Sequence, residues 1–226
     1  MRIHVPHEPI PLAIFVSGHG RGSNMKALIA GCADDSMNAV VAVVVGTRSD
    51  APAILTARGM GIDTVIISPK KYEADDEGYG QAILKALNRR SVRLICLAGY
   101  MRQLPANVVK HFNYRILNTH PALLPKFGGK GMFGEHVHRA VLASGDAITG
   151  CSVHFVDEEY DTGPTLLQRT VPVIEGDTPS TLAARVLKEE HIAYPEAVRL
   201  YSNNRVRIEN GIVIILPEFS QEKTDN

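Results

Sequence analysis

The 226-residue chain lacks several features that would place it in a special class of protein. Its 24 Lys and Arg residues balance 24 Asp and Glu residues, so no net charge attracts nucleic acid or an anionic membrane. No apolar run approaches the roughly 20 residues that a membrane-spanning helix needs. The segment 1–11 is polar and contains prolines, without the apolar core of a signal peptide. We therefore expect a cytoplasmic protein that binds neither nucleic acid nor a membrane.

Cysteine is also scarce, and its spacing argues against two further classes. The three cysteines, Cys32, Cys96 and Cys151, are odd in number and form no Cys-x-x-Cys pair. Neither a zinc site nor a disulfide framework is indicated, and we expect no bound metal. Cys96 lies inside an apolar run and is expected in the core. Unpaired thiols are typical of proteins in a reducing cytoplasm.

The composition that remains is that of an ordinary globular protein with an alternating α/β pattern. Hydrophobic residues make up 45% of the chain and charged residues 21%. In the first half, short apolar runs alternate with segments of helical spacing, which predicts a mostly parallel sheet with helices on both faces. The expected strands are 12–16, 40–45, 63–67, 92–97 and 115–118, and the expected helices are 24–33, 51–59, 76–89 and 105–111.

The second half predicts antiparallel additions to this sheet. Two β-rich stretches, 148–156 and 165–173, could pair antiparallel, and a terminal hairpin is expected at 206–215 around Asn210-Gly211. Between them a helix begins at Asp177-Thr178-Pro179 and runs toward Tyr194, where Pro195 should kink or end it. No repeat or linker is visible. We expect one domain over 1–226, with a polar extension at 1–11 and a polar tail at 217–226.

The run 116–125 places an amide and an imidazole at the end of an apolar strand. Asn118 and His120 are two residues apart, so their side chains share one side of an extended segment. Asparagine offers neutral N–H donors, and histidine accepts or donates a proton near neutral pH. The pair suits acyl or formyl transfer, in which an oxyanion develops while a proton moves. Taken alone, the run is equally consistent with a strand end followed by a turn.

The glycine-rich segment 17–24 joins the first strand to the first helix. In an open parallel sheet, free N–H groups at such a helix N-terminus can bind an anion. The glycine spacing does not match a dinucleotide fingerprint, and the Gly-Lys-Ser/Thr of a nucleotide P-loop is absent. We favour a phosphate-monoester site over a plain strand–helix turn, with Ser23 or Asn24 adding a side-chain hydrogen bond.

Two loops also carry polar groups. The segment 97–104 turns at Gly99, and its backbone could pair with a flat heterocycle, although a helix-entry loop is the more ordinary interpretation. The segment 157–164 is rich in acids and could be a solvated turn. Asp161 differs from its neighbours because Gly and Pro follow it and fix the loop. A carboxylate held near His120 would raise the basicity of that histidine and orient its ring.

Two glutamates lie in or beside the apolar stripe of the late helix. An acid on a buried helix face costs free energy unless it is paired. Either Glu189 or Glu190 could therefore meet a cationic or amine ligand, and the alternative is a surface residue at the edge of the stripe. The helical spacing does not choose between them.

Taken in order, these segments resemble the folate-dependent formyltransferase family over about 12–205. The Asn-x-His-Pro-x-Leu-Leu-Pro run at 118–125 and the Asp-x-Gly-Pro loop at 161–164 are shared across that family. The Gly-Ser-Asn segment at 22–24 and Leu-Ala-Gly-x-Met-Arg at 97–102 narrow the resemblance to its phosphoribosylglycinamide branch. Further matches are 149–156, Gln168 and Glu190-His191.

The resemblance implies a Rossmann-like formyltransferase fold and a reaction. A formyl group would pass from 10-formyltetrahydrofolate to the amine of 5-phosphoribosylglycinamide in purine synthesis, without a metal. The expected partners are these small molecules, and the expected assembly is a monomer or homodimer. By the same resemblance, Asn118, His120 and Asp161 would be catalytic; Gly22, Ser23, Asn24 and Glu190 would bind the ribotide; and Met101, Arg102, Gln103, Leu104, Asp157 and Tyr160 would line the pterin pocket.

The chain departs from the family pattern in two places. His19-Gly20 are extra residues in the first loop, and the segment 126–138 is longer than the common pattern. The second insertion leaves Lys126, His136 and His138 as candidate substrate contacts.

Three other functions would use part of the same pattern of residues or the same fold. A formyltetrahydrofolate deformylase would share the catalytic trio but use water, and usually has an extra N-terminal domain. A methionyl-tRNA formyltransferase needs a C-terminal RNA-binding domain and a basic surface. A non-catalytic phosphate or nucleotide sensor would use the first loop but has no need for Asn118, His120 and Asp161 together.

Overall fold

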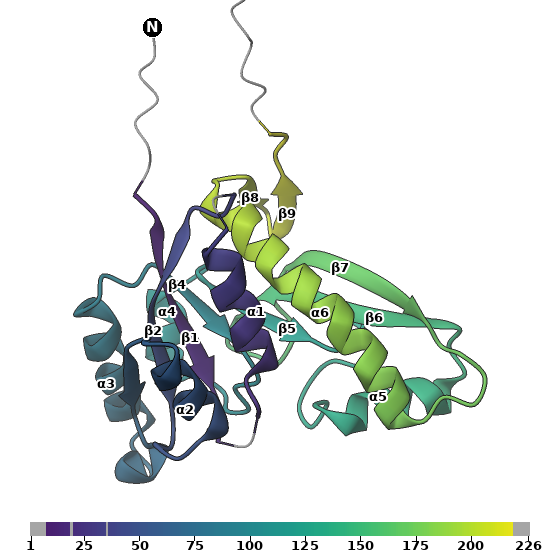
Figure 1. Ribbon diagram of the computed structural model, residues 1–226, viewed down its shortest axis with the longest axis horizontal. Coiled ribbons are helices and arrows are strands. Elements are labelled where there is room, and N and C mark those ends of the chain that lie inside the picture. Colours follow the sequence, from purple (N-terminus) through teal and green to yellow (C-terminus); the bar gives the residue numbers. More distant parts are fainter. Residues whose placement is uncertain (1–7, 19, 35, 219–226) are drawn as a thin grey trace, which may run out of the picture.

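A seven-stranded sheet runs through the centre of the computed structural model, which describes residues 8–18, 20–34 and 36–218 (Figure 1). The strand order is β3-β2-β1-β4-β5-β6-β7. Pairs among the first five strands are parallel, whereas β6 pairs antiparallel with β5 and with β7. The expected mostly parallel sheet with antiparallel additions is therefore confirmed. The strands are β1 (Ile10–Val16), β2 (Ala39–Gly46), β3 (Thr64–Ile66), β4 (Leu94–Leu97), β5 (Ile116–His120), β6 (Ile148–Phe155) and β7 (Thr165–Pro172).

Helices cover both faces of the sheet because its strands are apolar on both sides. Alternate residues of β1 enter two separate cores, with Leu12 and Ile14 in one and Ala13 and Phe15 in the other. The first core holds side chains of α1 (Ser23–Cys32), α2 (Pro52–Gly59), α5 (Glu135–Ser144) and α6 (Pro179–Ser202). The second holds those of α3 (Asp76–Asn88) and α4 (Ala106–His111), and the short 3₁₀ turn η1 (Pro69–Tyr72) packs on α3.

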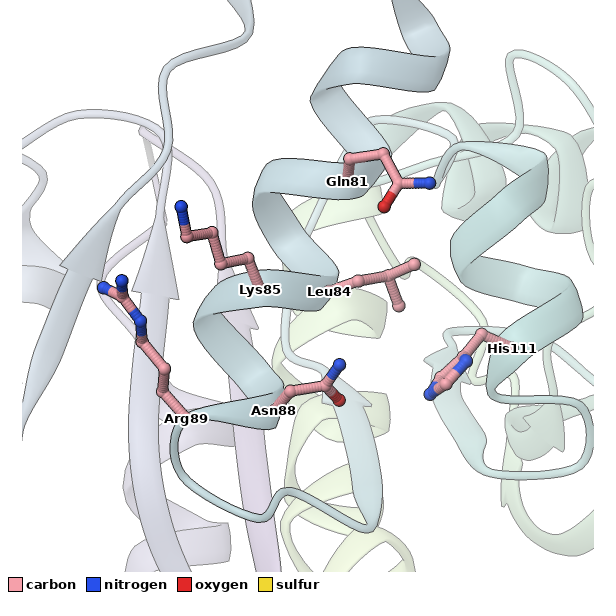
Figure 2. Close-up of a pocket in the computed structure, with 6 residues that line it drawn as sticks. All are labelled: Gln81, Leu84, Lys85, Asn88, Arg89 and His111. Atoms are coloured by element: carbon pink, nitrogen blue, oxygen red, sulfur yellow. The ribbon is translucent and has the colours of Figure 1, made fainter.

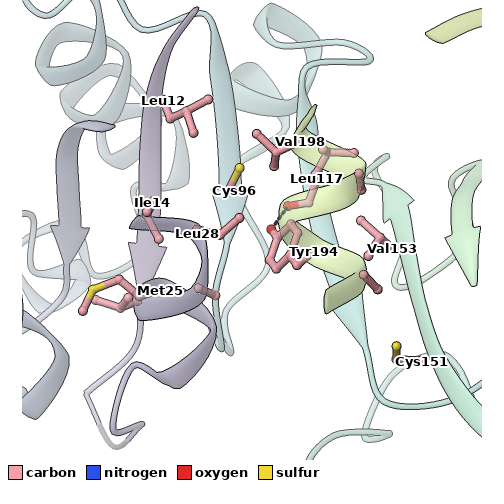
Figure 3. Close-up of a cluster of buried hydrophobic side chains, with 14 of the residues drawn as sticks. Leu12, Ile14, Met25, Leu28, Cys96, Leu117, Cys151, Val153, Tyr194 and Val198 are labelled. Atoms are coloured by element: carbon pink, nitrogen blue, oxygen red, sulfur yellow. Dashed lines mark hydrogen bonds between the residues drawn. The ribbon is translucent and has the colours of Figure 1, made fainter. Parts of the chain in front are cut away.

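One buried tyrosine hydrogen-bonds α6 to the sheet (Figure 3). Tyr194 of α6 is fully buried, and its hydroxyl donates to the carbonyl oxygens of Leu117 at 2.8 Å and Leu97 at 3.1 Å. Cys96 lies in the same cluster and is fully buried, as its apolar run predicts. The hydroxyl therefore ties α6 to β4 and β5 at the points where their polar ends begin.

The expectation that Pro195 interrupts the late helix is wrong in part. The helix begins as predicted, with Thr178 as N-cap in a reciprocal capping box with Thr181. It does not end at Pro195 but continues to Ser202, with Ala197, Val198 and Leu200 buried. An internal proline costs about 3 kcal/mol. Burying even two aliphatic side chains offsets a cost of this size, at about 1.5–3 kcal/mol each.

Other boundaries differ from the predicted ones. The strand β1 begins at Ile10, inside the expected 1–11 extension, whose residues 1–7 lie outside the described part of the chain, as do 219–226 of the expected tail. The strand β5 extends two residues past its predicted end because β6 pairs with Thr119 and His120. The helix α5 was not predicted at all. The hairpin of β8 (Val206–Glu209) and β9 (Ile212–Ile215) forms as expected.

Replacing Tyr194 with Phe should lower the free energy of unfolding by about 1 kcal/mol. The substitution removes the hydroxyl and its hydrogen bonds to two buried carbonyl oxygens but keeps the ring. Urea unfolding of the variant and the wild type measures this change. Tyr114→Phe, at an exposed position, is the matched control and should leave stability unchanged. An unfolding midpoint equal to the wild type's in the Tyr194 variant would contradict the assignment.

Candidate active site

A cavity of about 400 Å³ opens at the carboxyl ends of the parallel strands. It lies where the chain crosses over from β1 to one side and from β4 to the other, the place where open α/β sheets bind ligands. Its wall is built from seven parts of the chain: Asn24 of α1, Gly99–Met101, Asn118–Pro121, the glycine-rich segment 129–134, His138 of α5, Tyr160-Asp161, and the α6 residues Ala183, Ala184, Val186, Leu187 and Glu190.

The structure brings the three candidate catalytic residues together in this wall. His120 and Asn118 lie in β5, two residues apart, and Asp161 folds back from the loop between β6 and β7. The Asp161 Oδ2 atom lies 3.5 Å from Nδ1 of His120 and accepts a 2.9 Å hydrogen bond from the N–H of Gly129. Asp161 adopts a left-handed backbone conformation, with φ of 59°, which Asp tolerates better than most residues.

A fourth polar residue of the cluster, His154, was not among the residues predicted from the sequence. Its Nε2 lies 3.2 Å from Asn118 Nδ2 and 3.5 Å from Asp161 Oδ1. Its Nδ1 lies 2.9 Å from the carbonyl oxygen of Phe155, so Nδ1 carries the proton and Nε2 accepts from Asn118. His154 stands directly opposite Asn118 in the β5–β6 register. The antiparallel pairing of these two stretches is the signal that could have identified it.

Burial and charge set the protonation of the central pair. Burial lowers the pKa of His120 more than the charge of Asp161 and the carbonyl of Phe127 raise it, and His154 lowers it further. Burial raises the pKa of Asp161, but the neighbouring His154 and His120 and the hydrogen bond from the Gly129 N–H together bring it below its ordinary value. The site therefore combines an ionised Asp161 with a His120 that is neutral near pH 7.

The tautomer of His120 leaves one nitrogen ready for a proton. Its Nε2 lies 2.8 Å from the carbonyl oxygen of Phe127 and donates to it. In the neutral ring, Nδ1 then carries a lone pair and faces Asp161. A proton accepted at Nδ1 would be stabilised at once by the adjacent carboxylate, so this arrangement can take a proton from a bound group.

Glu190 is the glutamate that enters the cavity. It is 6% exposed, and its carboxylate accepts hydrogen bonds from Asn24 Nδ2 at 3.2 Å and from Thr119 Oγ1 at 3.3 Å. Burial raises its pKa to about 6, although both hydrogen bonds lower it. Glu189 instead forms an ion pair with Arg169 at 2.6 Å, away from the cavity wall. Helical spacing left open whether Glu189 or Glu190 could meet a ligand, and the structure places Glu190 in the cavity wall.

The sequence and fold comparisons point to one family. The profile of the formyl transferase family matches residues 11–198. The chain belongs to the formyl transferase family. It is 43% identical over 212 residues to the chloroplastic phosphoribosylglycinamide formyltransferase of Arabidopsis thaliana, covering 92% of this chain and 72% of that one.

Two further members differ in how much of their length this formyl transferase covers. The glycinamide ribonucleotide transformylase 1 of Symbiobacterium toebii superposes with a TM-score of 0.87 at 39% identity, covering 96% of this chain and 99% of that one. The trifunctional purine biosynthetic protein adenosine-3 of Bos taurus is 36% identical over 96% of this chain, which spans only 21% of that longer protein. The fold is therefore shared over nearly the whole chain.

Of the residues that the resemblance assigns to the ribotide, Asn24 and Glu190 line the cavity, whereas Gly22 and Ser23 lie beside it at the start of α1. Gly22 is the N-cap, with φ of 73°, and a Cβ there would lie 2.9 Å from the Cβ of Ala53. Among the described residues, the first turn has no acidic side chain and no side-chain cap, so its N–H groups can bind an anion. Residue 19 of the inserted pair lies outside the described part of the chain.

Of the residues assigned to the pterin pocket, Met101 and Tyr160 line the cavity, and the other four shape the loops around it. Gln103 Nε2 donates to the carbonyl of Glu158 at 2.6 Å and joins the two loops. Asp157 accepts from Thr162 Oγ1 at 2.7 Å. The last two pack against the second core: Leu104 is buried in it, and the guanidinium of Arg102 lies 6.0 Å from the ring centre of Tyr79.

A second hollow, between α3 and α4, is larger and shallower, but it does not bring together polar groups from several loops and strand ends (Figure 2). Gln81, Leu84 and Asn88 of α3 face His111 of α4, whereas Lys85 and Arg89 point away from it. It contains no acid and no group from the strand ends. The cavity beside β5 is therefore the candidate active site.

Two properties of the described residues concern membranes and metals. None of the helices within 8–18, 20–34 and 36–218 has the length and hydrophobicity of a membrane span. Within the same ranges, no three His, Cys, Asp or Glu side chains are grouped so that they could hold a metal ion.

Glu190→Gln should stabilise the fold at neutral pH but not in acid. Burial raises the pKa of Glu190 from 4.5 to about 6, so the folded chain holds this proton more tightly than the unfolded chain does. Ionisation therefore costs stability as pH rises from about 4.5 through 6, with a full effect of about 2 kcal/mol. Urea unfolding should show the variant more stable than the wild type above pH ~7 and equal to it below pH ~4.

Glu189→Gln is the matched control for that experiment, because its partly exposed carboxylate pairs with Arg169 outside the cavity. A stability difference between the Glu190 variant and the wild type that stays constant across this pH range would refute the assigned pKa.

Proposed function

We propose that this chain transfers the formyl group of 10-formyltetrahydrofolate to the amine of 5-phosphoribosylglycinamide, in purine biosynthesis. The observation that carries the proposal is the convergence of Asn118, His120 and Asp161 on one side of a cavity that Glu190 and the start of α1 close on the other. Relatives covering nearly the whole chain bear the name of this activity. The two sides suit the two substrates, an activated carbonyl and a phosphorylated amine.

Asn118 serves as the donor to the developing oxyanion. When the neutral amine attacks the formyl carbon, the carbonyl oxygen gains negative charge. The amide of Asn118 has two N–H groups, and one is engaged with His154, so the other is free to bond the oxyanion. A single preorganised donor of this kind is worth about 3 kcal/mol of transition-state stabilisation. His154 fixes the direction of the amide.

His120 accepts and returns the proton of the attacking amine, and Asp161 stabilises the charge that His120 then carries. The bond between the amine nitrogen and the formyl carbon forms while the bond from that carbon to the folate nitrogen breaks. The amine proton passes to Nδ1 of His120, whose charge Asp161 stabilises at 3.5 Å, and is then returned to the leaving folate nitrogen. The lowered pKa of His120 favours this relay over a permanent imidazolium that only stabilises the oxyanion. The folate supplies the activated carbon.

The phosphate of the acceptor is bound at the N-terminus of α1, and Glu190 binds the amine-bearing part. Asp161 and Glu190 are the acids of the cavity wall, and no Lys or Arg contributes to it among the described residues. The N–H groups of the first turn of α1, with the helix dipole behind them, therefore carry the recognition of the phosphate. A deformylase, which uses water, has no need for this half of the site.

A coupled assay with and without the ribotide separates the candidate reactions. Release of folate only when the ribotide is present supports formyl transfer to the amine. Folate release without the ribotide would assign the chain to the deformylases. No release under either condition would favour a binding protein of the same fold.

Asn118→Asp should lower kcat about 10²–10³-fold, because it keeps the size of the side chain but places a negative charge beside the developing oxyanion. Steady-state assays with both substrates measure the change. Asn107→Asp, at an asparagine of α4 outside the cavity wall, is the matched control and should retain turnover. Turnover at the wild-type rate in the Asn118 variant would remove the residue from the mechanism.

Ser23→Asp should raise the KM for the ribotide about tenfold or more without changing the KM for the folate. The new carboxylate occupies the first turn of α1 and repels the phosphate, while it interacts favourably with the helix dipole. Stability should therefore stay equal or rise, so misfolding cannot account for the weaker binding. Ser23→Ala, which removes only the hydroxyl, should have the smaller effect. Equal KM values for Asp and Ala variants would place the phosphate elsewhere.

A further inference from the structure

His138 is a buried histidine in the cavity wall that the proposed mechanism does not use. It lies in α5 and is 4% exposed. Its Nδ1 is fully buried and has no hydrogen-bond partner among the described residues. Buried polar atoms in native structures are nearly always paired, and an unpaired one costs about 1–3 kcal/mol. Because Nδ1 is itself fully buried, a bound group can reach the ring only from the side of Nε2, which is not among the fully buried atoms.

The surroundings of His138 keep its ring neutral. Burial lowers its pKa, and the nearby charge of His120 lowers it further, against a smaller opposite effect of Glu135. A neutral imidazole has one N–H donor and one lone-pair acceptor. The other cavity-facing elements near it are the apolar side chains of α6 and the glycine-rich segment 129–134. His138 is thus a neutral donor–acceptor group close to the reaction centre.

Most other polar side chains of the wall already have partners or tasks: Asn24 and Thr119 hydrogen-bond Glu190, the hydroxyl of Tyr100 bonds that of Tyr79, and Tyr160 lies in a loop assigned to the pterin. Asn118 and His120 serve the oxyanion and the proton, and the carboxylates of Asp161 and Glu190 can only accept hydrogen bonds when ionised. The acceptor substrate carries an amide between its amine and its sugar. An amide has one donor and one acceptor and lies next to the reacting amine, which matches the chemistry and the place of His138.

We propose that the imidazole of His138 hydrogen-bonds the amide of the acceptor substrate and so positions its amine beside His120. This inference rests on the proposed function and names a residue that determines acceptor specificity. It follows from the position of Nε2, the ring nitrogen that is not fully buried, from the burial of the rest of the ring, and from its place in the wall shared with His120.

Three substitutions in the full chain test the inference. His138→Leu removes both ring nitrogens and should raise the KM for the ribotide about tenfold, while the KM for 10-formyltetrahydrofolate stays at the wild-type value and kcat changes little. Asn places its amide where Nδ1 lies, and Gln places its amide where Nε2 lies. His138→Gln should therefore recover most of the wild-type KM, whereas His138→Asn should not.

His111→Leu is the matched control, an exposed histidine of α4 outside the cavity wall, and should leave all three constants unchanged. Equal ribotide KM values for the wild type and the Leu variant, or a parallel rise in the folate KM, would overturn the inference. If the Leu variant does not fold, as its thermal unfolding would show, the Asn and Gln variants decide, and wild-type ribotide KM values in both would overturn it. An inactive wild-type enzyme would instead refute the proposed function.

Discussion

The antiparallel pairing of β6 with β5 is the constraint on which the candidate active site depends. It sets His154 opposite Asn118 and carries the chain past the strand end into the loop that holds Asp161. That loop turns so tightly that Gly163 packs against the backbone of Phe155. A Cβ at position 163 would lie 1.9 Å from the Phe155 carbonyl oxygen, so only glycine fits there. The Phe155 N–H also bonds the carbonyl of Pro164 at 2.9 Å. Asp161 is thereby held against His120 by backbone geometry.

Burial tunes the polar groups of the cavity in opposite directions. It lowers the pKa of His120 and of His138 and raises that of Glu190, because a low-dielectric setting disfavours whichever form is charged. The pKa of Asp161 is lowered despite its burial, because the hydrogen bond from the Gly129 N–H and the two neighbouring histidines favour its ionised form. The result is a neutral base next to an ionised acid, an arrangement that can accept a proton and stabilise it. A buried carboxylate reduces stability in the free protein, which a bound substrate can relieve.

Local patterns predicted most of the sheet but less of the site. The alternation of apolar runs and helical segments located every strand, because strands covered on both faces are apolar throughout. Three features escaped this reasoning. The helix α5 follows an insertion with irregular glycines, the helix α6 continues through Pro195 because tertiary burial outweighs local propensity, and His154 acquires its partners only across the β5–β6 ladder. Glu190 and Glu189 were indistinguishable until packing placed one inside the cavity and the other beside Arg169.

The sequence by itself determined the elements, the strand that carries Asn118 and His120, and the resemblance to a formyltransferase family, because each depends on residues close together in the chain. Only the tertiary structure decided that Asp161, His154 and Glu190 meet that strand, and that His138 lies in the wall of the same cavity. The hydrogen bonds and the ion pair that join these residues to β5 link positions from 36 to 71 apart, as from Asn118 to His154 and from Thr119 to Glu190. No local spacing encodes such distances, since sheet register and helix packing set them.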